Sequence, residues 1–157
     1  MSRRIPVRSG PERSPNIVLL LREAFVALND LVIVRLAERG HDAVRPAHAA
    51  VFQYLDDTGT TVSVLAQRAR MTKQGMAQLV HHLEDHGYIA RTADPGDRRA
   101  KLVIPTDRGL EVFAIAQEIV PEIEDLVSSI IGADHKATMR DDLAAIRHRL
   151  RTSGDAR

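Results

Sequence analysis

The sequence contains no cysteine and no tryptophan, and aromatic residues make up only 3% of its 157 residues. Without cysteine the chain has no disulfide, no thiolate metal ligand and no thiol nucleophile. With so few aromatic residues, the core must be built from Leu, Val, Ile and Ala, a composition that favours helices. No apolar run approaches the ~20 residues of a membrane span, and the run from Ile17 to Leu21 is too short for the apolar core of a signal peptide. These absences predict a cytoplasmic protein that has no membrane partner.

Known patterns of enzyme chemistry are also missing. The sequence has no nucleophile–base pattern, no glycine-rich loop that would cradle a phosphate, and no paired acids in an identifiable pocket. We therefore expect no enzymatic activity and no cofactor. A hydrophobic content of 44% with 27% charged residues is ordinary for a globular chain. At this length we expect a single domain that buries roughly 68–70% of the surface exposed by the unfolded chain.

The most informative stretch is a predicted helix from Thr72 to His86. Thr72 is a good N-cap residue, and Gly87 tolerates the left-handed conformation that ends a helix. An apolar stripe recurs at helical spacing at Met76, Leu79, Val80 and Leu83. The opposite face carries Gln74, Gln78 and His81, flanked by Lys73, Gly75, Ala77 and His82, and holds no acid before Glu84 and Asp85. A face of donors and acceptors with little negative charge suits the edges of bases in a DNA major groove; the alternative is a polar face that only meets solvent.

After this helix the periodicity changes to that of a β-hairpin. Residues 88–92 and 101–104 read as short strands, and the connection between them contains Pro95-Gly96, which marks a turn. Two arginines, Arg98 and Arg99, lie near its tip. Asp97 is expected to hold an arginine side chain in one orientation, which would lower the entropy cost of binding. A helix followed by a basic hairpin is the arrangement of a winged helix.

The distribution of charge along the chain agrees with a helix and hairpin that bind DNA. Residues 68–109 hold eight basic and five acidic residues, a net charge of +3, whereas residues 110–151 hold five basic and eight acidic residues, a net charge of −3. The basic part coincides with the proposed reading helix and hairpin. Such a division would orient an encounter with a polyanion.

The run from Leu65-Ala66 through the DPGDRR hairpin to Thr106-Asp107-Arg108-Gly109 resembles the multiple-antibiotic-resistance-regulator (MarR) family of winged-helix repressors. The family's D-x-R wing pattern falls on Asp97 and Arg99, so the resemblance implies that Arg99 enters a DNA minor groove. It implies a mainly α fold with a small β-wing and long terminal dimerisation helices. Two residues depart from the family pattern: His82 stands where arginine is frequent, and Pro105 replaces a leucine, which we expect to shorten the wing. The residues assigned to DNA contact are Ser63, Thr72, Lys73, Gln74, Gln78, His81, His82, Asp97, Arg98, Arg99 and Lys101.

The predicted organisation is one winged-helix domain over residues 17–152, with a mobile arm at 1–16 and a tail at 153–157. Within the domain we expect a DNA-binding lobe at 46–109 and dimerisation helices at 17–40 and 110–152. Ser63 is expected to cap a short helix that ends at Ala69, and Asp134 to cap the last helix. The first helix is apolar on more than one side and the last two helices carry heptad-like seams, so we prefer an intertwined homodimer to an intrachain hairpin. A two-fold dimer reads an inverted repeat with half-sites about 10 bp apart.

The sequence contains two further candidate sites. His82 and His86 have the spacing of a two-histidine metal half-site, but no third ligand is identifiable, so we expect no metal. Together with His81 they could instead raise DNA affinity as the pH falls. The resemblance also implies a small aromatic or anionic effector in a crevice between the dimer helices and the DNA-binding lobe. The residues that match this crevice are Arg22, Phe25, His48 and Phe52, each of which has core or surface packing as its alternative role.

The leading hypothesis is therefore a homodimeric regulator of transcription, a repressor that binds double-stranded DNA and is released by an effector. The alternative from another class is a winged-helix module whose basic face binds an acidic protein. Steep weakening of duplex binding with salt and a preference for an inverted repeat would favour the first. The same weak affinity for every duplex would favour the second.

Overall fold

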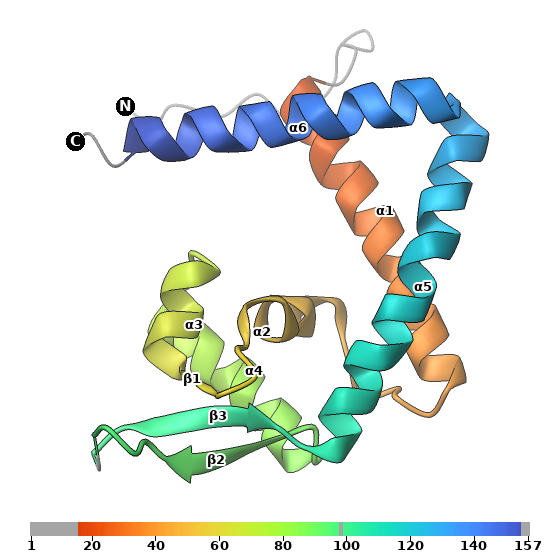
Figure 1. Ribbon diagram of the computed structural model, residues 1–157. Helices are drawn as coiled ribbons and strands as arrows, with labels where there is room; N and C mark the ends of the chain where they lie inside the picture. Colours follow the sequence, from red (N-terminus) through yellow and green to blue (C-terminus); the bar gives the residue numbers. More distant parts are fainter. Residues whose placement is uncertain (1–15, 98, 155–157) are drawn as a thin grey trace, which may run out of the picture.

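The computed structural model describes residues 16–97 and 99–154, so Arg98, most of the expected N-terminal arm and the last three residues lie outside the described chain. The elements, in order, are α1 (Ile17–Glu38), the 3-10 turn η1 (Pro46–His48), α2 (Ala49–Tyr54), β1 (Thr60–Thr61), α3 (Val62–Arg68), α4 (Lys73–Asp85), β2 (Ile89–Ala93), β3 (Lys101–Pro105), α5 (Asp107–Ile131) and α6 (Ala133–Gly154). Figure 1 shows a lobe made of α2, α3, α4 and the sheet, and a frame made of α1, α5 and α6. The expected fold class, mainly helical with a small β-wing, is confirmed.

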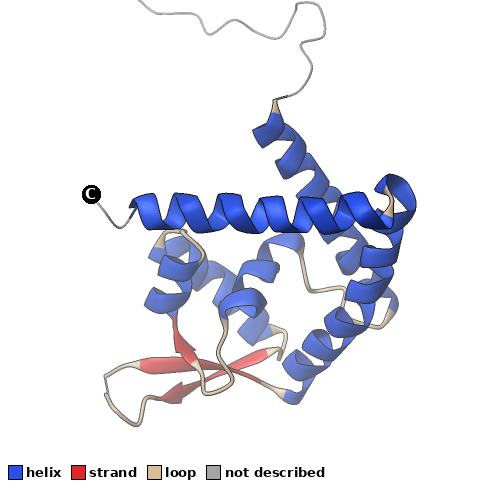
Figure 2. Cartoon of the chain, turned by 45° about the horizontal axis from the view of Figure 1, so that its top comes forward, coloured by secondary structure: helices blue, strands red, loops and turns tan. Residues whose placement is uncertain are grey.

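The sheet has three antiparallel strands in the order β1-β3-β2. Thr60 pairs with Val103 across one edge of β3 and Arg91 pairs with Val103 across the other, so the short strand β1 lies against the hairpin. Figure 2 shows the sheet below the helices of the lobe. The expectation that Pro105 shortens the hairpin is wrong, because Pro105 is the last residue of β3 and pairs with Ile89. Proline is tolerated there because it stands at a strand end, where the missing N–H interrupts no continuing ladder.

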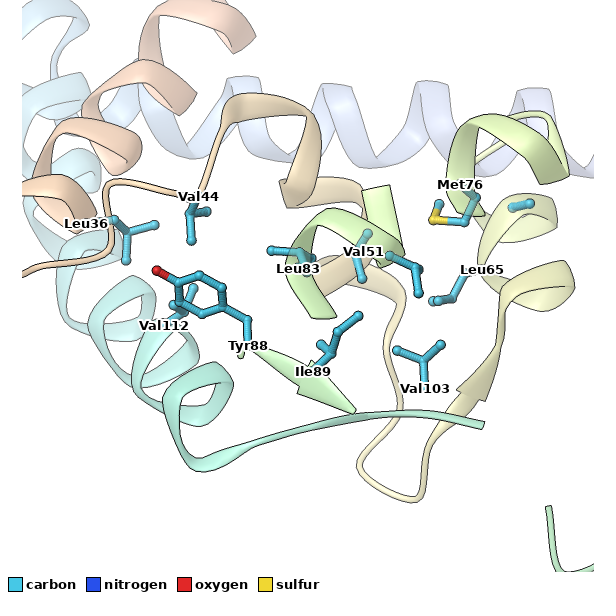
Figure 3. Close-up of a cluster of buried hydrophobic side chains, with 12 residues drawn as sticks. Leu36, Val44, Val51, Leu65, Met76, Leu83, Tyr88, Ile89, Val103 and Val112 are labelled. Atoms are coloured by element: carbon cyan, nitrogen blue, oxygen red, sulfur yellow. The ribbon is translucent and has the colours of Figure 1, made fainter. Parts of the chain in front are cut away.

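The core of the lobe lies where α2, α3, α4 and the sheet meet, as Figure 3 shows. The apolar stripe predicted for α4 faces this core, with Met76, Val80 and Leu83 fully buried and Leu79 packed at its margin. Burial of each such side chain contributes roughly 1.5–3 kcal/mol. The stripe therefore fixes the rotation of α4 about its axis and holds the polar face outward.

The helix-turn-helix within the lobe is formed by α3, α4 and the residues between them. The Thr72 side chain accepts the N–H of Gly75 at 3.0 Å, which confirms it as the N-cap of α4. Ser63 was expected to cap α3, but Thr61 does so by accepting the N–H of Val64. Both hydroxyls suit a cap by chemistry; Thr61 takes the role because pairing of β1 with β3 ends there and leaves its backbone extended. Ser63 therefore lies in the first turn of α3.

The start of α5 is hydrogen-bonded to the residues that follow α4. Thr106 caps α5 by accepting the N–H of Gly109 at 3.2 Å, and its hydroxyl donates to the carbonyl oxygen of Gly87 at 2.6 Å. A Cβ atom at Gly109 would lie 2.1 Å from the carbonyl oxygen of Tyr88, so glycine alone permits this approach. The lobe and the long helix are thus joined by close backbone contact.

The frame consists of long helices that meet at few points. α5 runs from Asp107 to Ile131 without interruption at Pro121, and Gly132, with φ +86°, turns the chain into α6. Asp134 was expected to cap α6, but it lies inside the first turn, where its carbonyl oxygen accepts the Thr138 hydroxyl at 3.1 Å. Within residues 16–97 and 99–154, no helix has the length and apolarity needed to cross a membrane.

Candidate nucleic-acid interface

The outer face of α4 is the centre of the candidate interface. Lys73, Gln74, Gln78 and His81 are all exposed, while the buried stripe on the other side holds the helix in place. Thr72 is also exposed, and its cap contact uses the oxygen as acceptor and leaves the hydroxyl proton for another partner. The structure therefore brings five predicted residues to one accessible face that is rich in hydrogen-bonding groups.

The two acids at the end of α4 are paired with nearby bases. Glu84 lies 3.0 Å from the Nε atom of Arg91 on β2, and Asp85 lies 3.5 Å from Nδ1 of His81. Pairing of Glu84 with Arg91 reduces the repulsion that a free carboxylate would exert on an approaching phosphate. Sequence reasoning missed Arg91, because its role depends on the way β2 folds back beside α4.

His82 does not lie on the exposed face as expected. Its Nε2 atom is 3.0 Å from the carbonyl oxygen of Ala43, and its ring is stacked between those of His48 and His86, with centroid distances of 4.7 and 4.2 Å. The half-buried ring thus joins the end of α4 to η1 and the segment before it. The proposed contact of His82 with DNA has no support from this position, and of the three histidines of α4 and its cap, His81 alone shares the face of the glutamines.

His48 is the buried member of this stack. Its Nδ1 atom accepts the backbone N–H of Arg45 at 2.9 Å, so the ring is neutral with its proton on Nε2. Burial, followed by the positive charges of His82, Arg45 and His86, lowers the pKa of His48 to about 4. His48 is therefore a packing residue of the lobe.

The tip of the hairpin is ordered by side chain to backbone hydrogen bonds. Asp97 Oδ1 accepts the backbone N–H of Arg99 at 2.9 Å, and Asp94 Oδ1 accepts that of Gly96 at 2.8 Å. Asp97 was expected to hold a guanidinium group, but in the part of the chain that is described no ion pair joins it to Arg99. Asp97 instead fixes the backbone from which Arg99 extends into solvent. Lys101 is exposed at the start of β3, and Arg98 lies outside the described residues.

The four residues expected to line an effector crevice do not gather around one cavity. Arg22 and Phe25 are exposed on α1, His48 is buried in the histidine stack, and Phe52 packs edge-on against Phe113 at 5.2 Å. Two cavities of the structure are lined by other residues, which include Arg68, Arg70 and Arg147. The shared position of these arginines was not predicted, because Arg147 is far along the chain from Arg68 and Arg70 and only the fold brings it near them.

Comparison with known proteins agrees with this geometry. The profile of the MarR family matches residues 44–100, which span the helix-turn-helix and most of the hairpin. Transcriptional regulator HosA of Escherichia coli O111:H- is 26% identical over 125 residues, which cover 77% of this chain and 93% of that protein. The expected resemblance to the MarR family is therefore confirmed over residues 44–100. The relatives that match are transcriptional regulators, a role that is not enzymatic.

Solved structures of MarR-family regulators share the fold. S. aureus MepR in complex with DNA has a TM-score of 0.68 at 18% identity, over 87% of this chain and 99% of that chain. CouR from Rhodococcus jostii RHA1 bound to p-coumaroyl-CoA has a TM-score of 0.65 at 26% identity, over 85% of this chain and 92% of that chain. Among the described residues, no cluster of three or more potential ligands could hold a metal ion.

Proposed function

We propose that this MarR-family regulator is a homodimer that binds an inverted-repeat operator in double-stranded DNA and represses transcription until a small molecule releases it. The observation that carries the proposal is the outer face of α4, where Gln74 and Gln78 stand exposed beside Lys73 and His81. A glutamine amide can pair bidentately with adenine in the major groove. The basic hairpin beside this helix supports a second contact through Arg99.

Two relatives support the DNA partner. MepR was solved in complex with DNA, and CouR was solved bound to a 23-mer DNA duplex, with a TM-score of 0.67 to this chain at 22% identity, over 84% of this chain and 92% of that chain. The electrostatics of this chain agree, since the acid nearest the reading face is paired with Arg91. The CouR complex with p-coumaroyl-CoA supports control by an organic anion.

Dimerisation is supported by the apolar surface of the frame. Large hydrophobic side chains stay exposed along one or more faces of its three helices: Ile17, Val18, Leu20, Leu21, Phe25, Val120, Leu126, Ile130, Met139, Leu143, Ile146 and Leu150. An extended apolar surface of this kind marks a protein–protein interface. α6 packs mainly on α5 within the protomer, so the seam that the sequence predicted for α6 is left for a second copy of the chain.

The proposal is tested by selecting duplexes from a random pool and measuring their affinity by fluorescence anisotropy. We expect an inverted repeat to be enriched, and affinity to fall steeply with salt because bound phosphates release counterions. Gln78→Ala should weaken the selected duplex by about 10-fold or more, as expected for loss of a base contact worth ~1–3 kcal/mol, and should change which base is preferred.

Gln117→Ala is the matched control, since Gln117 is an exposed glutamine on α5. This variant should bind the selected duplex as the unaltered protein does. An equal loss of affinity for every duplex in Gln78→Ala would contradict base reading. No discrimination among duplexes by the unaltered protein would instead favour a module that binds an acidic protein.

A further inference from the structure

The side chain of Tyr88 reaches from the lobe into the frame. Tyr88 lies between α4 and β2, and its side chain is fully buried. Figure 3 shows its ring pointing toward Leu36 of α1 and Val112 of α5, and all three residues belong to one buried cluster. A residue of the lobe therefore packs against two helices of the frame.

Arg108 holds this ring through directional contacts. It lies in the first turn of α5, with its Cζ atom 4.7 Å from the centroid of the Tyr88 ring. Its Nη2 atom donates to the Tyr88 hydroxyl at 3.2 Å and to the carbonyl oxygen of Gly40, just after α1, at 3.3 Å. A guanidinium group is attracted to the face of an aromatic ring, and its planar fork fixes the direction of its hydrogen bonds. One side chain thus joins the lobe to the ends of two frame helices.

His41 packs against the same ring from the segment after α1. The two ring centroids lie 5.7 Å apart, and His41 is only 5% exposed. Its Nε2 atom is 3.7 Å from the Glu111 carboxylate of α5, while its Nδ1 atom is buried without a hydrogen-bond partner among the described residues. A buried nitrogen without a partner lowers stability. A ring without that nitrogen should therefore pack against Tyr88 at least as stably.

The backbone contact at Gly109 fixes a point of the lobe but not its angle. Gly109 lies directly against the carbonyl oxygen of Tyr88, and the lobe could still turn about this contact. The nearby packing of Phe52 on Phe113 is apolar, and apolar attraction has little directionality. The directional contacts of Tyr88 with Arg108 oppose such a turn.

We propose that Tyr88, Arg108 and His41 form a joint that fixes the angle of the lobe on the frame, and that this angle selects the spacing of the half-sites that the dimer binds. This role rests on the proposed function, in which the frames of two copies associate and each lobe carries one α4 helix to the duplex. The angle of the lobes then sets the separation of the two α4 helices. Because Tyr88 and His41 are buried and Arg108 contacts Tyr88, they act through the position of α4 and not by touching DNA.

The geometry of the duplex makes spacing a sensitive measure of this joint. Each base pair added between the half-sites moves one of them by ~3.4 Å along the duplex and turns it by about 35°. A rigid joint therefore accepts one spacing, whereas a loose joint accepts several.

The first measurement changes the distance between the half-sites of the selected duplex by one and by two base pairs. By fluorescence anisotropy, the unaltered protein should bind the best spacing at least about tenfold more tightly than a spacing changed by two base pairs. Arg108→Gln should lower this ratio at least about threefold and leave the affinity for a duplex with one half-site within about twofold, because α4 itself is unchanged. A variant that is merely less stable would weaken every spacing by the same factor.

Further variants separate the ring contacts from the rest of the frame. Tyr88→Phe keeps the ring but loses the hydroxyl, so it should lower the spacing ratio less than Arg108→Gln does. His41→Phe keeps a ring against Tyr88 and should keep the ratio, with a midpoint of thermal unfolding that is equal or higher, whereas His41→Ala should lower the ratio. Arg35→Gln is the matched control, because Arg35 is an exposed arginine of α1 whose ion pairs are with residues of α1 and α5. It should bind every spacing as the unaltered protein does.

The second measurement is made without DNA. The chain has no cysteine, so spin labels can be attached to cysteines introduced at Thr92 of β2 and Gln117 of α5, both of which are exposed. Labelled protein diluted with an excess of unlabelled protein reports distances within one protomer. Pulsed dipolar spectroscopy should give one narrow distance distribution, which widens about 1.5-fold or more in Arg108→Gln and stays narrow in Arg35→Gln.

The joint is refuted if Arg108→Gln keeps the spacing ratio, weakens all spacings equally, or keeps the narrow distance distribution. It is also refuted if Arg35→Gln lowers the ratio as much. Intact operator binding with an unchanged ratio contradicts the joint alone. If the unaltered protein selects no inverted repeat, the proposed function fails, and the role of the joint in spacing fails with it even where the distribution widens.

Discussion

His48 makes the stability of the lobe depend on pH. Its pKa is lowered to about 4 in the folded chain, chiefly by burial, whereas a histidine in the unfolded chain titrates near its ordinary value of about 6.5. Between these values the unfolded state binds more protons than the folded state, so the free energy of unfolding falls as the pH falls. We expect the decline to begin near pH 6.5 and to continue to about pH 4, measured by urea denaturation at several pH values.

His48→Asn is the variant that isolates this effect. The asparagine oxygen can accept the N–H of Arg45 in place of Nδ1, but the side chain does not titrate. The variant should be less stable at pH 7.5 because it lacks the stacked ring, and its stability should change less between pH 7 and pH 5. Parallel pH profiles for the variant and the unaltered protein would show that other groups cause the decline.

Single residues were predictable from the sequence where local backbone chemistry decides their role. Thr72 caps α4 as expected, because the cap needs only a hydroxyl before an apolar-periodic run. The prediction that Ser63 caps α3 was wrong, because the position of the cap depends on where β1 stops pairing with β3. The prediction that His82 lies on the exposed face was wrong for the same kind of reason, since its partners Ala43 and His48 come from another part of the chain.

At the scale of the element, the hairpin tip gives a prediction about the wing. Asp97 orders the backbone before Arg99, whose side chain is exposed. Narrow A·T-rich minor grooves attract arginine, so Arg99→Ala should weaken operator binding about tenfold or more at moderate salt, measured by fluorescence anisotropy. The fold should be unaffected, because the side chain is free of the core.

Arg99→Lys serves as the comparison for Arg99→Ala. Lysine keeps the charge but lacks the planar guanidinium group, so it should restore the salt dependence of binding more fully than the affinity. If Arg99→Ala keeps full operator affinity, the hairpin does not enter a groove. If lysine restores the affinity completely, the contact is one of charge alone.

Elements with strong periodicity were predictable from the sequence, and their boundaries held to within about a residue. The predicted helix of residues 72–86 corresponds to α4 with its two caps, and the hairpin strands are β2 and β3. The exception, Pro105, stays in β3 because its strand partner Ile89 is fixed by burial in the core. The cavity lined by Arg68, Arg70 and Arg147 was not predictable, since Arg147 reaches the other two only through the return of α6 over the lobe.

At the scale of the whole molecule, the frame exposes many large apolar side chains that a single protomer does not bury. α1 was expected to have two apolar sides, and Phe25 on it is 63% exposed in the protomer. α6 adds Ile146, which is 49% exposed, on a helix that packs mainly on α5. Both residues can be changed without disturbing the core of the lobe.

Phe25→Glu should therefore separate association from folding. A carboxylate buried without a partner at the interface between two copies is strongly unfavourable, so the dissociation constant of the dimer should rise at least about 100-fold, measured by sedimentation or by light scattering after gel filtration. Leu110→Glu is the matched control, because Leu110 is 51% exposed at the start of α5, away from α6. A monomer that still reads the inverted repeat with full affinity would refute the dimer as the unit that binds DNA; a Phe25→Glu dimer as stable as the unaltered one would place the interface elsewhere on the frame.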